Sequence, residues 1–139
     1  LDSRYYFDEK NVLDLFSGTG NIAFEFSSRG AEHITTLDSN NNCVNFIKKI
    51  SSDLELNITS LKSDCIKYLE SCEKQFNIIF ADPPYNFEEY QKIKEIIFER
   101  NLIKKNGSLI IEHDSSTSFE DDNVEVRKYG TVHFSIFSF

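Results

Sequence analysis

Short apolar runs alternate along this chain with segments whose apolar residues recur at helical spacing. The apolar runs predict strands at residues 11–16, 33–38, 57–62, 76–81 and 108–113. The intervening segments predict helices at residues 22–29, 40–54, 64–71 and 90–100. Repeated strand–helix units are typical of an α/β domain with a doubly wound, mainly parallel sheet.

The C-terminal part of the chain follows a different pattern. Polar and apolar residues alternate over 124–129 and again over 131–139, on either side of Gly130. Such alternation predicts an antiparallel strand pair that closes the sheet. Asn106-Gly107 predicts a turn into the strand at 108–113. We therefore expect one domain over residues 1–139.

The composition bounds the class of protein. Lys and Arg total 15 against 23 Asp and Glu, and the net charge of −8 argues against a protein whose whole surface binds nucleic acid, although it allows a local basic patch. No apolar run of about 18 residues is present, so no membrane-spanning helix is predicted. The three cysteines form no CxxC pair, and free thiols favour a reducing compartment, which is the cytoplasm.

A glycine turn, Gly18-Thr19-Gly20, lies between the first predicted strand and the first predicted helix. Glycine allows a sharp turn and lets a ligand approach the backbone without meeting a Cβ. A plain strand-to-helix turn is the structural alternative, and Gly18, Gly20 and Ala23 also fit the G-x-G-x-x-A pattern of dinucleotide-binding proteins. Asp38 closes the second strand, where a carboxylate accepts hydrogen bonds from ribose hydroxyls. Nicotinamide and adenosyl-methionine sites share this arrangement.

Two further acidic residues accompany the first and third strands. Asp14 lies inside the apolar first strand, where burial of an unpaired carboxylate costs several kcal/mol. A ligand with a cationic amine or sulfonium would stabilise Asp14, whereas a pyrophosphate would be repelled. Alternatively, Asp14 accepts hydrogen bonds from backbone N–H groups of the glycine turn. After the third strand, Asp64 is placed to accept from an adenine amino group and the Cys65 backbone to donate, but Asp64 equally fits a helix N-cap.

The sequence Asp82-Pro83-Pro84-Tyr85 follows an almost wholly apolar strand. Two consecutive prolines remove two N–H donors and fix φ, so the segment is expected to form a rigid ledge. A ledge with a carboxylate on one side and an aromatic ring on the other suits a planar substrate that carries an NH₂ group. Asp82 and the Pro83 carbonyl would accept hydrogen bonds from the amine, and Tyr85 would stack on the ring. The structural alternative is a rigid turn before a helix.

The histidines and cysteines do not suggest a metal site. His33, His113 and His133 lie far apart in the sequence, in or beside predicted strands, and we interpret each as structural. Cys65 and Cys72 share one helical face, which indicates packing. We therefore expect no metal.

Residues 14–20 together with 82–85 resemble motifs of the S-adenosylmethionine-dependent amino methyltransferases. The nearer resemblance is to the RsmD-type bacterial 16S ribosomal RNA guanine-N2 methyltransferases, through residues 24–31 and 127–131. This resemblance spans nearly the whole chain, and it implies a Rossmann-like methyltransferase sheet with S-adenosylmethionine as cofactor. Members of that family carry an Arg-Pro-Thr-rich segment before the first strand. The chain starts at Leu1 with nothing like it, so it is expected to lack an N-terminal segment.

The resemblance also implies a role for each motif. The glycine turn and the strand before it would hold the methionine part of the cofactor, the acidic residue after the second strand the ribose, and the pair after the third strand the adenine. The implied cofactor-binding residues are Asp14, Phe16, Ser17, Gly18, Thr19, Gly20, Asp38, Ser39, Asp64 and Cys65. The implied catalytic residues, which hold the target amine, are Asp82, Pro83 and Tyr85.

The sequence thus predicts methyl transfer from S-adenosylmethionine to the N2 amine of a guanine in 16S ribosomal RNA, by a monomer. The substrate is naked RNA or an assembling small ribosomal subunit, and the target base leaves its stack to reach the ledge. Three alternatives stay open. They are the same chemistry on adenine N6 in DNA or RNA or on a protein glutamine, a nicotinamide-dependent oxidoreductase, and a non-catalytic binding module.

Overall fold

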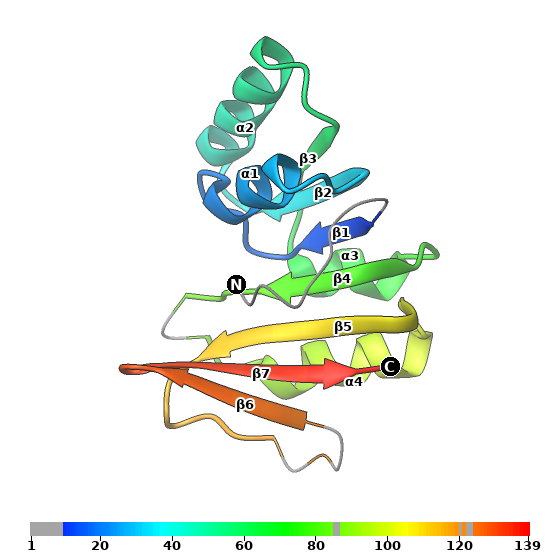
Figure 1. The fold of residues 1–139 in the computed structure, drawn as a ribbon, viewed down its shortest axis with the longest axis vertical. Coiled ribbons are helices and arrows are strands. Elements are labelled where there is room, and N and C mark those ends of the chain that lie inside the picture. Colours follow the sequence, from blue (N-terminus) through cyan, green and yellow to red (C-terminus); the bar gives the residue numbers. More distant parts are fainter. Residues whose placement is uncertain (1–9, 85–86, 120, 122–123) are drawn as a thin grey trace.

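A mixed sheet with helices on both faces makes up the described part of the chain in the computed structural model (Figure 1). The structure describes residues 10–84, 87–119, 121 and 124–139. The strands are β1 (Asn11–Asp14), β2 (His33–Asp38), β3 (Ile58–Lys62), β4 (Phe76–Ala81), β5 (Ile103–His113), β6 (Val124–Tyr129) and β7 (Val132–Ser138). The helices are α1 (Asn21–Ser28), α2 (Asn41–Asp53), α3 (Cys65–Ser71) and α4 (Tyr90–Arg100).

The strands follow the order β3-β2-β1-β4-β5-β7-β6 across the sheet. β1 to β5 pair in parallel, whereas β7 pairs antiparallel with both β5 and β6. The predicted doubly wound, mainly parallel sheet with an antiparallel C-terminal pair is confirmed. The strand order reverses between β1 and β4, and ligands of such sheets bind at that point, beyond the carboxyl ends of the strands. The extent of the domain over residues 1–139 stays a prediction.

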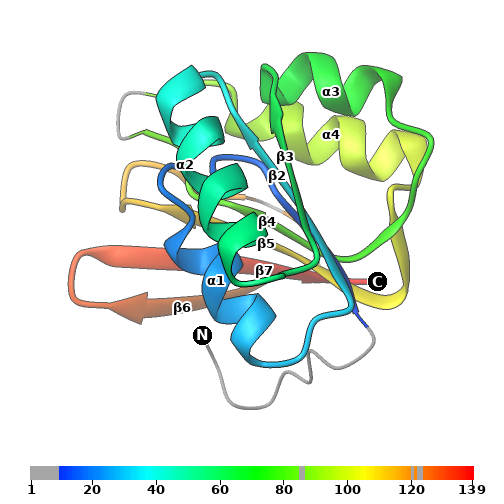
Figure 2. The same ribbon diagram turned by 90° about the horizontal axis from the view of Figure 1, so that it is seen from above.

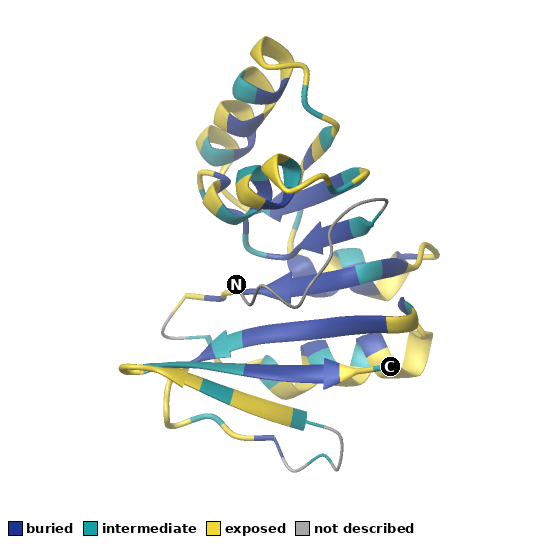
Figure 3. Cartoon of the chain, viewed as in Figure 1, coloured by how far each residue is buried: buried dark blue, intermediate teal, exposed yellow. Residues whose placement is uncertain are grey.

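The helices form a layer on each face of the sheet, with α1 and α2 on one side and α3 and α4 on the other (Figure 2). β4 is therefore buried on both faces (Figure 3). Its residues Ile78 and Phe80 pack in one core with Phe26 of α1, and Ile79 packs in the other core with Ile93 of α4. This double burial explains why β4 is almost wholly apolar in sequence. None of the described helices is long and apolar enough to cross a membrane.

β5 is longer than the sequence predicts, because it begins at Ile103 rather than at 108. Its pairing with β4 shifts register between the Phe76–Ile103 and Ile78–Ser108 pairs, which makes a bulge. Asn106 takes a positive φ of 69° within this bulge. The predicted turn before the strand is therefore wrong, since Asn and Gly also mark bulges within strands.

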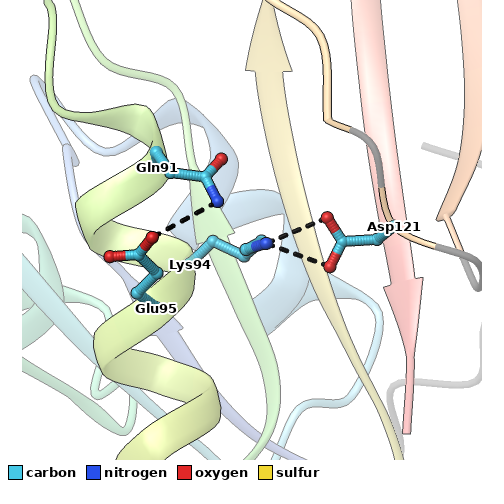
Figure 4. A network of polar contacts seen from close by, with 4 residues as sticks. All are labelled: Gln91, Lys94, Glu95 and Asp121. Atoms are coloured by element: carbon cyan, nitrogen blue, oxygen red, sulfur yellow. Dashed lines mark hydrogen bonds and ion pairs between the residues drawn. The ribbon is translucent and has the colours of Figure 1, made fainter.

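The segment between β5 and β6 is attached to α4 by a charged contact (Figure 4). The Lys94 ammonium donates to both carboxylate oxygens of Asp121, at 2.9 and 3.0 Å. The two side chains are only 12% and 22% exposed, so this ion pair is shielded from water more than a surface pair is. Lys94 lies one turn after Tyr90, and the contact therefore fixes the loop beside the end of α4 that faces the carboxyl edge of the sheet.

Replacement of Lys94 by methionine leaves the carboxylate of Asp121 partly buried without its ammonium partner. We expect Lys94→Met to lower the free energy of unfolding by about 1–3 kcal/mol, measured by urea denaturation. The matched control is Lys92→Met, because Lys92 lies 3.8 Å from Glu89 and both side chains are 52% exposed. The control should change stability by less than about 0.5 kcal/mol. Equal losses in the two variants would contradict this account of the contact.

Candidate active site

Three of the predicted acidic residues meet at the carboxyl edge of the sheet. Asp14 ends β1 and Asp38 ends β2, while Asp82 follows β4, which pairs with β1. The three carboxyl groups are close enough that the negative charges of Asp82 and Asp38 both raise the pKa of Asp14. The parallel pairing of the strands thus brings together residues that lie far apart in the sequence.

The glycine turn is tied to the end of β2 by several hydrogen bonds. Asp38 accepts from the backbone N–H of Gly18 at 2.9 Å through one carboxylate oxygen and from that of Asn40 at 2.8 Å through the other. The Ser17 backbone N–H and hydroxyl both donate to the Leu37 carbonyl, at 2.9 and 3.0 Å. The turn is therefore held in shape by the protein itself. Thr19, at its tip, is exposed.

The two glycines of the turn have different physical roles. Both have positive φ, 53° at Gly18 and 92° at Gly20. A Cβ at Gly20 would lie 2.9 Å from atoms of both Ile47 and Phe24, so this position is closed by the packing of α1 and α2. A Cβ at Gly18 would meet no described atom within 4 Å. Gly18 is thus the glycine at which a ligand has room to approach the backbone.

Asp14 is 1% exposed and accepts one long hydrogen bond, of 3.3 Å, from the backbone N–H of Phe16. Of the predicted contacts between Asp14 and backbone N–H groups of the loop, the structure shows this one, from a residue just before the glycine turn. This hydrogen bond does not offset burial, because burial is the main cause that raises the pKa of Asp14 from 3.8 to about 7, with smaller contributions from Asp82 and Asp38. A cation placed beside this carboxyl would stabilise its charged form.

The residues after β3 have a structural role in the fold. The Asp64 carboxylate caps α3 by accepting from the backbone N–H of Lys67 at 3.1 Å, so the predicted N-cap alternative is confirmed. The Cys65 side chain is buried, and burial raises the pKa of its thiol to about 12, which keeps it neutral and unreactive. A contact of Asp64 and Cys65 with adenine stays a prediction, as does a role of the exposed Ser39 in cofactor binding.

The ledge after β4 begins with an exposed Asp82, a buried Pro83 and an exposed Pro84. The Pro84 carbonyl accepts a hydrogen bond from the backbone N–H of Phe87 at 2.9 Å. Tyr85, predicted to stack on the substrate, lies outside the described residues.

Aromatic rings join the ledge to the glycine turn. The Phe87 ring makes edge contacts with Phe16, next to the glycine turn, and with Tyr90 at the start of α4, each with ring centroids 5.3 Å apart. The Tyr90 ring in turn contacts His113 at the end of β5, at 6.4 Å. The structure places the Phe16 ring in edge contact with Phe87, and its predicted role in cofactor binding stays a prediction.

Sequence reasoning missed Glu112. The β4–β5 register pairs Ala81 with Ile111, which places Glu112 beside Asp82, and the two carboxyl groups share a hydrogen bond. Partial loss of water, followed by the charge of Asp82, raises the pKa of Glu112 to about 7, and loss of water also raises that of Asp82. No local sequence signal marks Glu112, because its place beside Asp82 depends on the register of β5 against β4.

The Asp82–Glu112 pair lines a pocket of about 290 Å³. The pocket is lined by residues at the ends of β4 and β5 and at the turn of the β6–β7 hairpin. These strand ends lie at the left of Figure 1. Its lining residues are Asp82, Pro83, Tyr90, Glu112, His113, Asp114, Thr131 and Val132. A carboxyl pair with a tyrosine ring and a hairpin tip around it is suited to a small planar ligand with hydrogen-bond donors.

Two of the histidines have partners that fit a structural role. The Nε2 of His113 lies 2.6 Å from the Ser135 hydroxyl, and its Nδ1 lies 2.8 Å from the Asp114 carbonyl. The Nδ1 of His33 lies 3.0 Å from the Asn57 side-chain oxygen. Within the described ranges, no three or more His, Cys, Asp or Glu side chains are arranged to hold a metal ion.

The sequence matches the family described as Conserved hypothetical protein 95 over residues 3–138. The chain belongs to this family. A candidate rRNA methyltransferase of Bacillus subtilis, named YlbH, is 30% identical to this chain. The match covers 95% of this chain and 77% of YlbH. Ribosomal RNA small subunit methyltransferase D of Buchnera aphidicola is 28% identical over 78% of this chain, which spans 56% of that relative. The predicted resemblance to RsmD-type methyltransferases is confirmed.

Solved structures share the fold. A candidate methylase from Haemophilus influenzae superposes with a TM-score of 0.85 at 23% identity, over 96% of this chain and 88% of that one. A 16S rRNA N2 methyltransferase from Thermus thermophilus, RsmC, superposes with a TM-score of 0.75 at 17% identity, over 94% of this chain and 38% of that one. The chain therefore has the predicted Rossmann-like methyltransferase sheet.

Substitution of Gly20 should destabilise the fold. A methyl group there combines a positive φ with contacts of 2.9 Å, so we expect Gly20→Ala to lower the free energy of unfolding by about 2–4 kcal/mol. Gly18→Ala is the matched control, since it carries the cost of positive φ without the contacts, about 1 kcal/mol. Urea denaturation of both variants measures the difference. A Gly18→Ala loss as large as that of Gly20→Ala would show that packing against Ile47 and Phe24 is not the cause.

Asp14 should make stability depend on pH. Because burial raises its pKa from 3.8 to about 7, the folded protein retains a proton that the unfolded chain has released between these values. This one group therefore lowers the free energy of unfolding by about 1.4 kcal/mol per pH unit over that window, and its effect levels off above pH 7. We expect Asp14→Asn to gain stability relative to the unsubstituted protein as the pH rises from 4 to 8. Parallel stability profiles of the two proteins would contradict the raised pKa.

Proposed function

We propose that this chain binds S-adenosylmethionine and transfers its methyl group to the N2 amine of a guanine in 16S ribosomal RNA. The observation that carries the proposal is the pairing of β1 with β4, with buried Asp14 at the end of one strand and Asp82-Pro83 after the other. One half of this edge favours a cation, and the other half offers acceptors to an amine.

The family relatives support the choice of RNA as substrate, because two of them are named for ribosomal RNA methylation. The Thermus thermophilus protein supports the cofactor and the N2 amine. It is named as a 16S rRNA N2 methyltransferase and was solved with S-adenosylmethionine and guanosine.

The residues at the edge of β1 and β2 fit such a cofactor. Asp14 is buried with its pKa raised, so a positively charged sulfonium or ammonium group nearby would stabilise its carboxylate. The open space at Gly18 lets a ligand lie against the backbone. The two oxygens of Asp38 each accept one backbone hydrogen bond, and a carboxylate keeps acceptor capacity beyond that for ribose hydroxyls. S-adenosylmethionine would supply an electrophilic methyl group on a sulfonium.

The residues after β4 would orient the amine. An exocyclic amine is a poor nucleophile, because its lone pair is delocalised into the ring. Hydrogen bonds from its N–H groups to the Asp82 carboxylate and the Pro83 carbonyl would direct the lone pair toward the methyl group. Holding nitrogen and methyl carbon in line at near-attack distance would give most of the acceleration. The amine proton becomes acidic only as the N–C bond forms, so Asp82 or water suffices to accept it.

The test is a substitution that separates transfer from cofactor binding. We expect Asp82→Ala to lower methyl transfer to 16S ribosomal RNA by at least about 100-fold, because it removes the charged acceptor of the amine. Binding of S-adenosylhomocysteine, measured by titration calorimetry, should change by less than about twofold. Transfer is followed with labelled S-adenosylmethionine, on naked 16S RNA and on assembled small subunits.

Glu88→Ala provides the control for this experiment, since Glu88 is an exposed carboxylate six residues further along the same connection. Full activity of Asp82→Ala on the RNA would overturn the assignment of Asp82. Binding of NAD in preference to S-adenosylhomocysteine would overturn the cofactor assignment and favour an oxidoreductase.

A further inference from the structure

The function of Asp82 leaves its neighbour Glu112 unexplained. Glu112 continues β5 one residue beyond the Ala81–Ile111 pair, as Asp82 continues β4, so the two side chains lie next to each other on adjacent parallel strands. Both line the same pocket, and their carboxyl groups are hydrogen-bonded to each other. Two carboxyl groups in contact are unfavourable when both are ionised, and a ligand that donates hydrogen bonds to both of them would offset this repulsion.

The dimensions of this pocket suit a single base. Its volume of about 290 Å³ is just below the range for sites of drug-sized molecules, roughly 300–1,000 Å³. The Tyr90 ring lies on α4, and Thr131 and Val132 come from the tip of the β6–β7 hairpin. These groups surround the carboxyl pair with one aromatic surface and a short polar–apolar rim, which suits a flat heterocycle.

The hydrogen-bonding pattern of the carboxyl pair distinguishes the purines. Guanine presents two neighbouring donors on one edge, the N2 amine and the N1–H. Adenine presents the N6 amine beside N1, which is an acceptor. Two ionised carboxyl groups complement two donors, and they repel an unprotonated acceptor.

We propose that Glu112 selects guanine, by accepting a hydrogen bond from N1–H while Asp82 accepts from the N2 amine. This inference rests on the proposed function, and it adds the residue that determines which base is methylated. Asp82 alone would accept a hydrogen bond from any aromatic amine. Glu112 would distinguish a donor from an acceptor at N1, the ring atom next to the amine. Loss of one charge-assisted hydrogen bond to the base corresponds to a factor of about 10–100 in kcat/KM.

The proposal predicts how the pH affects substrate binding. Loss of water is the main cause that raises the pKa of Glu112 to about 7, and it raises the pKa of Asp82 as well, so Glu112 carries a proton below about pH 7. Two guanine donors require both groups ionised, so KM for a guanine substrate should fall as the pH rises from 6 to 8. A substrate with an acceptor at N1 requires the proton on Glu112, and its KM should rise over the same interval.

Other titratable groups that face this carboxyl pair also affect the pH dependence of KM. Asp14 lies beyond Asp82 on β1, Tyr90 faces the pair from α4, and Asp114 follows β5. His113 lines the pocket, and the His133 ring on β7 is 5.7 Å from it. The pKa of Asp14 is raised to about 7 as well. The contribution of Glu112 is therefore the difference between the KM–pH profiles of the unsubstituted protein and of a Glu112 variant.

The probe for N1–H is 2-aminopurine, which carries the same exocyclic amine as guanine but has an unprotonated N1. The methylated position of 16S RNA is first located by mass spectrometry of the product. An RNA fragment that contains this position is then made with either guanine or 2-aminopurine there. At pH 8 we expect a preference for guanine of about 10–100-fold in kcat/KM, falling below about threefold at pH 6.

The decisive variant is Glu112→Gln, in which an amide of the same shape can either accept from N1–H or donate to N1. We expect it to reduce the guanine preference below about threefold at both pH values, and to raise KM for the guanine fragment about tenfold. The lack of O6 in 2-aminopurine affects both proteins equally, so the difference between them reports on N1. Glu99→Gln, an exposed carboxylate of α4, is the matched control and should keep the preference. Unchanged S-adenosylhomocysteine binding verifies that the variant is folded.

Two outcomes would overturn the inference, and they are distinguishable. If guanine N2 is methylated but Glu112→Gln keeps the full preference and pH profile, the selection of guanine by Glu112 is wrong while the proposed function stands. If the methylated position is not a guanine N2 amine, the proposed function and the inference fall together.

Discussion

Parallel pairing of β4 with β1 on one side and β5 on the other is the constraint on which the site depends. It brings Asp14, Asp82 and Glu112 to neighbouring strand ends, although they are separated by most of the chain. Loss of water is the main cause that raises the pKa of each of the three groups, and the charge of Asp82 raises the pKa of Asp14 and of Glu112 further. The sheet thus accumulates negative groups at one edge at a cost in stability, and bound positive charge and hydrogen-bond donors reduce that cost.

The rest of the fold maintains this edge. Ile78 and Phe80 anchor β4 in one core, and Ile79 anchors it in the other, so the ledge extends from the strand that is buried on both faces. A series of ring contacts from Phe16 through Phe87 to Tyr90 spans the glycine turn and the pocket. Because cores of this kind are close-packed, a shift on one side of the edge is transmitted to the other.

Most of the architecture could be predicted from the sequence, because apolar runs that alternate with helical periodicity are local signals. The glycine turn, Asp38 and the ledge could be predicted for the same reason, since each is a short motif at the end of a run. Glu112 could not be found this way, because its importance comes from its register against Asp82, a non-local property. The bulge at Asn106 was assigned wrongly because the residues that form a turn also form a bulge. Likewise, Asp64 fits a helix cap and a ligand contact equally well in sequence, and the structure shows the cap.

Asp82 is the common neighbour of both halves of the site, since its charge acts on Asp14 and on Glu112. A cation beside Asp14 favours the ionised form of that carboxyl, and the negative charge on Asp14 then acts on Asp82. Donors from a base favour the ionised forms of Asp82 and Glu112 in the same way. In the proposed function, the cofactor and the base therefore each change the protonation state that the other meets. The overall charge of −8 does not reveal this coupling, because the relevant acids are a few neighbours at the end of one sheet.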